Sequence, residues 1–151
     1  MTEVGKKAPK FKLMDQDENI ISLSDFLGKK VVLYFYPKDD TPGCTTEACN
    51  FRDSFPNFKN IDAVILGVSP DSPASHKKFI KKFNLPFTLL SDEDKSVLEK
   101  YGVWKEKSMY GRKYLGVERT TFVIDEEGTI KKIFNKVKVT DHHNEVFEAL
   151  Q

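Results

Sequence analysis

The sequence predicts an α/β fold in which helices cover both faces of a mixed central sheet. Two continuous apolar runs, 31–36 and 63–68, are rich in β-branched and aromatic residues and are typical of strands buried on both faces. The stretch 45–54 between them lacks glycine and proline, which fits a crossover helix and makes the two strands parallel. Two later apolar runs, 120–125 and 129–134, surround a Glu-Glu-Gly turn and predict an antiparallel hairpin.

Three further helices follow from local start and stop signals. The first begins at Ser72-Pro73 and ends before Leu85-Pro86, because proline suits the first turn of a helix and interrupts a later one. A short helix within 97–101 ends at Gly102. The last helix is expected to be capped by Thr140-Asp141. Helices placed between strands in this order favour a sheet sandwiched by helical layers.

Length and charge indicate one domain that spans residues 1–151. The chain has 24 lysine and arginine residues against 23 aspartate and glutamate residues, a net charge of +1. This balance argues against binding to nucleic acid or to an anionic membrane surface. The longest apolar run has only six residues, and the N-terminal segment lacks the apolar core of a secretory signal. We therefore expect a cytoplasmic protein.

The chain contains two cysteines, and Cys44 is placed for chemistry. It follows the apolar strand after a run of turn-forming residues, 37–43, and it lies where the crossover helix should begin, near Thr45. In α/β proteins, active sites commonly lie at the C-terminal ends of the parallel strands, which is where Cys44 is expected. The free N–H groups and the dipole of a helix start both favour a thiolate over a thiol. The position predicts a nucleophile, although an inert buried cysteine is the structural alternative.

Neither a metal nor a dithiol motif is indicated. Cys49 follows Cys44 after four residues, which is not the C-x-x-C spacing of a dithiol reductase. His76, His142 and His143 are scattered without the spacing of zinc ligands, and an iron–sulfur cluster would require more cysteines. We expect no metal and no organic cofactor.

The segment from Pro37 to Cys49 resembles a known motif. The pattern Pro37-x-x-x-Thr41-x-x-Cys44, continued to Cys49, is similar to the peroxidatic motif of peroxiredoxins, and more narrowly of the peroxiredoxin Q or bacterioferritin comigratory protein subfamily. Segments 5–11, 23–26 and 118–125 also resemble that family in the same order, so that the likeness covers essentially the whole chain.

The resemblance implies a thioredoxin-like fold and an enzyme that reduces hydrogen peroxide and organic hydroperoxides. Cys44 would be the peroxidatic nucleophile, and Arg119 the cation that stabilises both the thiolate and the peroxide. The hydroxyl of Thr41 would bridge sulfur and substrate, and Pro37 would shield the pocket from water. Glu47 would support Arg119 or cap the helix. A surface ion pair for Arg119 and an exposed carboxylate for Glu47 remain the structural alternatives.

Cys49 matches the resolving cysteine of the family, which forms a disulfide with the oxidised Cys44. In an ideal helix, Cα atoms five residues apart are separated by roughly 8.6 Å. A disulfide tolerates no more than about 7 Å. The first helical turns would therefore unwind in each catalytic cycle. The resemblance further implies thioredoxin, or alternatively glutaredoxin, as reductant and a monomeric protein.

Two other functions use the same residues. A non-enzymatic peroxide sensor would use oxidation of Cys44 to reshape the helix and so control a partner. A thioredoxin-fold binding or chaperone module would carry the two cysteines incidentally.

Overall fold

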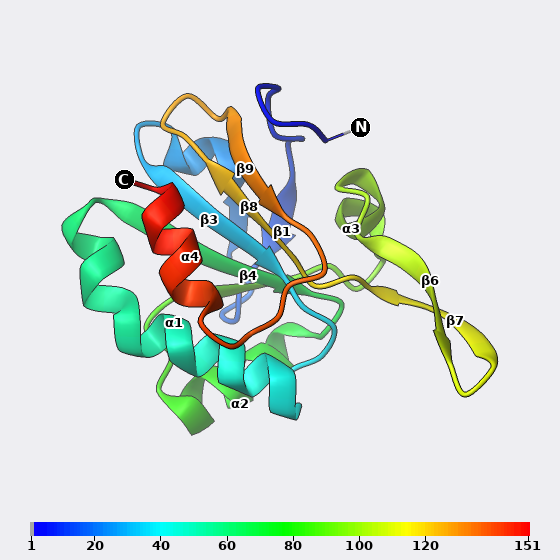
Figure 1. The fold of residues 1–151 in the computed structure, drawn as a ribbon. Coiled ribbons are helices and arrows are strands. Elements are labelled where there is room, and N and C mark those ends of the chain that lie inside the picture. Colours follow the sequence, from blue (N-terminus) through cyan, green and yellow to red (C-terminus); the bar gives the residue numbers. More distant parts are fainter. Residues whose placement is uncertain (1) are drawn as a thin grey trace.

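A computed structural model describes residues 2–151, and within them a seven-stranded sheet organises the protein (Figure 1). The strand order is β2-β1-β5-β4-β3-β8-β9. The bounds of these strands are β1 Lys12–Met14, β2 Ile20–Ser22, β3 Lys30–Phe35, β4 Ala63–Ser69, β5 Thr88–Ser91, β8 Thr120–Ile124 and β9 Ile130–Phe134. Strands from both ends of the chain thus meet in one sheet.

The sheet is mixed, as predicted. Strand β3 pairs with β4 in parallel and with β8 in antiparallel orientation, and β4 pairs with β5 in parallel. Strands β8 and β9 form the predicted antiparallel hairpin, while β1 runs antiparallel to both β5 and β2. Strand β3 is therefore an interior strand of the sheet, with a hydrogen-bonded neighbour on each side.

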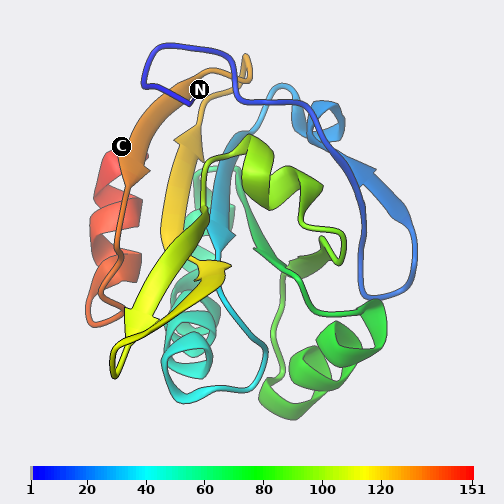
Figure 2. The same ribbon diagram turned by 90° about the vertical axis from the view of Figure 1, so that its right-hand side faces the viewer.

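Helices cover both faces of the sheet (Figures 1 and 2). On one face lie α1 (Pro42–Asn60), α2 (Pro73–Phe83) and α4 (His142–Ala149). The opposite face is covered by α3 (Ser96–Lys100), by the 3₁₀ helix Leu23–Phe26 and by the N-terminal segment. Because side chains alternate along a strand, β3 contributes to two apolar layers. Val31, Leu33 and Phe35 pack toward α3, whereas Val32 and Tyr34 pack toward α1.

The predicted limits of the crossover helix were wrong at both ends. Helix α1 begins at Pro42 rather than near Thr45, because proline at the first position has no N–H to lose and a φ already suited to the helix. It ends at Asn60 rather than at residue 54 and runs through Pro56. The exposed Pro56 forfeits one backbone hydrogen bond, which is offset by the complete burial of Phe51 and Phe58 on the same helix.

The other helix ends agree with the sequence, with one difference in mechanism. The Ser72 side chain accepts from the Ser75 N–H at 3.2 Å and caps α2. Helix α4 does begin after Asp141, but this residue is left-handed, with φ 65°, and its carboxylate accepts from the Asn144 side chain rather than from the backbone. Asp141 is therefore not the conventional cap that we expected.

The sequence did not predict the hairpin of β6 (Trp104–Met109) and β7 (Arg112–Val117), which projects from the body of the protein (Figure 1). Charged residues occupy both of its faces and hide the strand periodicity. The signal lies in the turn, because Tyr110 and Gly111 both have positive φ, 51° and 78°, as a two-residue hairpin turn requires. The short strands β1 and β2 were not predicted either.

No helix within residues 2–151 combines the length and the apolar character needed to cross a bilayer.

The tight contact between β4 and β3 can be tested at Gly67. A Cβ atom on Gly67 would lie 2.7 Å from Leu89 Cδ2 and 2.9 Å from Tyr34 Cζ. We expect Gly67→Ala to lower the free energy of unfolding by about 1–3 kcal/mol in urea titrations, because these side chains must move. Gly116→Ala is the matched control in a strand, where the nearest atom lies at 3.4 Å. Equal stability changes in the two variants would contradict the packing argument.

Candidate active site

The site forms where β3 ends and α1 begins. Residues 36–41 connect the two elements, and Thr41 is the N-cap of α1, with an extended backbone. Cys44 is the third residue of the helix and is only 1% exposed. The first helical backbone bond runs from the Thr45 N–H to the Thr41 carbonyl at 2.8 Å. The N–H of Cys44 precedes it, so the helix itself provides no acceptor for that group.

Arg119 reaches Cys44 from the neighbouring strand. It directly precedes β8, whose first residue, Thr120, is paired with Phe35 at the end of β3. The antiparallel register therefore brings Arg119 to the end of the sheet at which β3 finishes and α1 starts. Its Nη2 donates to Cys44 Sγ at 3.3 Å. The backbone carbonyl of Arg119 accepts from the Val137 N–H at 2.9 Å, which holds the residue in place.

Glu47 holds the other end of the guanidinium. Arg119 Nη1 donates to Glu47 Oε1 at 2.7 Å, one helical turn after Cys44. Gly43 leaves room beside this contact: a Cβ there would lie 3.1 Å from Arg119 Nη2, so the guanidinium would have to shift by a few tenths of an ångström. The sequence thus brings Cys44, Glu47 and Arg119 together as the resemblance implied, and the surface alternatives for Glu47 and Arg119 do not hold, because their side chains are 1% and 17% exposed.

Burial shapes the charges of the pair. Desolvation raises the pKa of Glu47 to about 7, although the Arg119 guanidinium opposes the shift. Desolvation also acts against the charge of Arg119, but Glu47 and Cys44 outweigh it and raise the pKa of the guanidinium. Arg119 therefore stays cationic. Oxygen Oε2 of Glu47 has no hydrogen-bond partner among residues 2–151.

Tyr34 is a further polar group of the site, and the sequence analysis missed it. Its hydroxyl is buried and, within residues 2–151, has no hydrogen-bond partner. Burial raises the pKa of Tyr34 well above its ordinary value, and the nearby Glu47 and Cys44 act in the same direction. The phenol therefore keeps its hydrogen and remains a potential donor. Strand alternation could have indicated it, since Tyr34 faces the same side as α1.

Pro37 and Thr41 both lie half-buried in the loop before α1. The hydroxyl of Thr41 donates to the Lys38 carbonyl at 2.9 Å, so its lone pairs remain free to accept from another group. The structure places both residues at the entrance to the helix that carries Cys44. Their predicted contacts with a substrate stay predictions.

Cys49 lies further along α1 and is half-buried. Both cysteines are free and both belong to the intact helix, which is the arrangement expected of the reduced protein. Arg52 lies close to Cys49: hydrogen bonding to Asp53, and to a lesser degree the charge of Cys49, raises the pKa of that guanidinium.

A second cation approaches the site from the unpredicted hairpin. Desolvation lowers the pKa of Lys107 on β6, the positive charge of Arg119 acts in the same direction, and Cys44 acts against it. Lys107 is thus near enough to both groups to sense their charges. No sequence spacing could have placed it there, because the hairpin itself was not recognised.

One group of side chains within residues 2–151 resembles a metal site. The ligand atoms of Asp39, Asp71 and His76 lie within 4.8 Å of one another. The carboxylate oxygens already accept hydrogen bonds from protein groups, among them the hydroxyls of Tyr36 and Ser69. The contacts therefore favour an internal hydrogen-bond network over a cation site. The sequence does not indicate this group, because the spacing of His76 along the chain does not show that it lies beside Asp39 and Asp71.

Comparison with known proteins identifies relatives along the whole chain. The AhpC/TSA family profile matches residues 4–133. A "Putative peroxiredoxin bcp" of Coxiella burnetii is 56% identical over 98% of both chains. "Peroxiredoxin Bcp" of Bacillus subtilis is 55% identical over 99% of this chain and 93% of its own.

Solved structures agree with these relatives. A Cys-to-Ser mutant of PrxQ from Xylella fastidiosa superposes with a TM-score of 0.94 at 38% identity, over 99% of this chain and 96% of that one. A Xanthomonas campestris bacterioferritin comigratory protein, described for alkyl peroxide reduction, gives 0.88 at 42% identity, over 93% and 89%.

Fold and relatives together define a class, the thiol-dependent peroxidases built on a thioredoxin-like fold. The chain belongs to the AhpC/TSA family, within which its relatives are the Bcp and peroxiredoxin Q proteins. The resemblance, the fold class and the assignment as an enzyme are thereby confirmed. The comparisons favour the peroxidase over the sensor and the binding module.

The raised pKa of Glu47 predicts a specific pH dependence of stability. Between pH 4.5 and about 7 the folded protein holds a proton on Glu47 that the unfolded chain has lost. Stability should therefore fall as the pH rises through this interval, by up to about 3 kcal/mol, and Glu47→Gln should remove this contribution. Urea titrations across the interval, with the exposed Glu148→Gln as control, measure it. A wild-type minus Glu47→Gln difference that is constant with pH would contradict the assignment.

Proposed function

We propose that the chain reduces hydroperoxides by attack of the Cys44 thiolate on the terminal peroxide oxygen. The S–O bond forms as the O–O bond breaks, leaving a sulfenic acid on Cys44. The departing oxygen takes up a proton and leaves as an alcohol, or as water when the substrate is hydrogen peroxide. The observation that carries this proposal is the 3.3 Å hydrogen bond from the Arg119 guanidinium to Cys44 Sγ.

The surrounding groups supply what the reaction needs. Negative charge moves from sulfur to the departing oxygen, so that donors should face both atoms. Arg119 and the free N–H of Cys44 lie beside the sulfur, and the accepting lone pairs of Thr41 can receive the peroxide O–H. Pro37 would exclude water from the loop side. Glu47 acts as a positioning residue, because its carboxylate orients the guanidinium.

Cys49 is proposed as the resolving cysteine. Its thiolate attacks the sulfenic sulfur of Cys44, and the disulfide forms as hydroxide leaves and is protonated to water. Both cysteines lie on α1, five residues apart, which exceeds the reach of a disulfide in an ideal helix. The start of α1 must therefore unwind after each attack and reform after each reduction.

The disulfide must then be reduced by two electrons from outside the chain. Members of this family use thioredoxin-type dithiol proteins, and we propose thioredoxin, or alternatively glutaredoxin, for this chain. A cytoplasmic location suits two cysteines that must be returned to the thiol state. We further propose that residues 1–151 form one domain and that the protein works as a monomer, since the site described here lies within one chain.

The substrates proposed are hydrogen peroxide and organic hydroperoxides. The Xanthomonas campestris relative is described for alkyl peroxide reduction, which supports the organic class. The attacked atom is the same in both, because each substrate presents a terminal O–H group.

The two cysteines should fail differently when replaced. In peroxide consumption coupled to thioredoxin, we expect Cys44→Ser to fall to the uncatalysed rate, because the nucleophile is missing. Cys49→Ser should complete one turnover, with a sulfenic acid on Cys44 by mass spectrometry, and then stop. Activity retained in Cys44→Ser would refute the peroxidatic assignment, and a single slow oxidation without recycling in the wild type would favour a sensor.

Arg119→Lys tests the guanidinium while keeping the charge. Lysine cannot donate to Cys44 and Glu47 at once from a planar fork, so we expect the second-order rate with peroxide to fall by about 100-fold. The exposed Arg112→Lys serves as control and should react at the wild-type rate. A wild-type rate in Arg119→Lys would show that positive charge alone is sufficient.

A further inference from the structure

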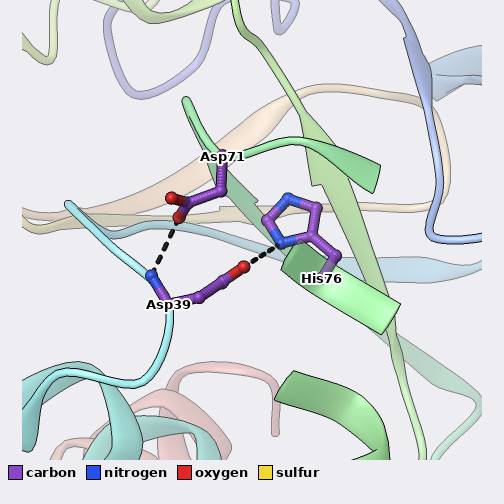
Figure 3. A group of neighbouring side chains, drawn as sticks. All are labelled: Asp39, Asp71 and His76. Carbon is purple, nitrogen blue, oxygen red and sulfur yellow. Dashed lines mark hydrogen bonds and ion pairs between the residues drawn. The ribbon is translucent and has the colours of Figure 1, made fainter. Parts of the chain in front are cut away.

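The loop that leads into α1 is tied down at Asp39, which is 7% exposed. Asp39 Oδ1 accepts from the Tyr36 hydroxyl at 2.6 Å, and Oδ2 accepts from the Ser75 hydroxyl at 2.7 Å. His76 Nδ1 lies 2.7 Å from the same Oδ2 (Figure 3). The backbone N–H of Asp39 donates to Asp71 Oδ2 at 2.8 Å. Each carboxylate oxygen of Asp39 therefore has a partner.

The hydrogen-bond partners of His76 assign a hydrogen to each of its ring nitrogens. Nitrogen Nε2 of the fully buried His76 lies 2.9 Å from the Leu90 carbonyl, which can only accept, so Nε2 carries a hydrogen. Nδ1 faces a carboxylate oxygen that already accepts from Ser75, so it must carry one as well. Burial, followed by the charge of Asp39, raises the pKa of Tyr36, which keeps that hydroxyl a donor. These contacts match an imidazolium of His76 that donates to the Asp39 carboxylate and to the Leu90 carbonyl.

A second tie joins the same loop to α2. Asp40 is left-handed, with φ 57°, and its carboxylate accepts from Lys82 Nζ at 2.7 Å. Ser75, His76 and Lys82 all belong to α2. The start of α1 is thus held from α2 through the loop and from β8 through Arg119.

We propose that Asp39 and His76 are positioning residues of the peroxidase. Their ion pair holds the loop before α1, which keeps Cys44 beside Arg119 and opposes the unwinding of the first helical turn. This role rests on the function proposed for Cys44 and Cys49. It has opposite consequences for the two chemical steps: release of the loop slows attack on peroxide and speeds formation of the disulfide.

The test measures both steps in one protein. Rapid quenching with an alkylating reagent, followed by mass spectrometry, counts the sulfenic acid and the disulfide against time. In His76→Gln we expect attack to slow by about tenfold and disulfide formation to become about threefold faster. Tyr101→Phe removes a partly buried hydrogen bond to the Pro9 carbonyl on the opposite face of the sheet, and should leave both rates unchanged.

Rates that are unchanged in His76→Gln, or that both fall, would overturn the positioning role. Should that variant not fold, Ser75→Ala removes one donor to Asp39 and should shift the two rates in the same opposite directions by smaller factors. Nitrogen NMR of the wild type provides a separate test: both ring nitrogens of His76 should carry hydrogen at neutral pH. An unprotonated ring nitrogen would overturn the ion pair. A wild type that forms no sulfenic acid on Cys44 would instead overturn the proposed function, and the positioning role with it.

Discussion

The hydrogen bonds of one guanidinium keep the reactive part of this protein together. Arg119 directly precedes β8 and contacts both Cys44 and Glu47 on α1, so it joins two elements that are distant in sequence. Two nearby residues accommodate the guanidinium. Gly43 leaves room for it, and the carboxyl group of Glu47 is buried against it, which raises the pKa of Glu47 to about 7. A site of this kind sacrifices some stability for a fixed cation beside a sulfur atom.

The same helix must be both well placed and able to unfold. Attack on peroxide needs Cys44 at a fixed distance from Arg119, whereas a disulfide with Cys49 needs the two residues to leave their helical positions. Residues outside α1 hold Cys44 near Arg119: Arg119 itself, which precedes β8, and the loop before α1, which is bonded to α2. The loop contacts of Asp39 and Asp40 do not involve the turns that must open, since both residues precede the helix, whereas the Arg119 contacts with Cys44 and Glu47 must break when those turns unwind. Rigidity in the surroundings is thus compatible with a change in the helix itself.

Much of the fold could be read from the sequence, and the failures have physical causes. Strands β3, β4 and β8 were predicted because they form continuous buried runs, which leave a clear pattern in the sequence. Strand β9, with two exposed lysines, was predicted together with the Glu-Glu-Gly turn that precedes it. The β6–β7 hairpin was missed because its strands carry charges on both faces. At the site, the position of Cys44 followed from strand and helix order, but the roles of Arg119 and Glu47 needed the family resemblance. The contact of Asp39 with His76 joins residues 37 positions apart in the chain, and only the pairing of the strands brings them together.

Pro56 has a consequence for how far a disturbance of α1 can travel. Because it has no N–H, the ladder of backbone bonds is interrupted at its partner, Arg52. Ahead of that gap lies the stretch with the two sulfurs, and beyond it Phe58 is anchored in the apolar layer beneath. Unwinding that starts at the N-terminal end of α1 therefore reaches the missing backbone hydrogen bond after about three turns. The cooperativity between successive turns is weakest at that point. The C-terminal part of α1, after Pro56, can stay helical and provide the turn from which the N-terminal part forms its helix again.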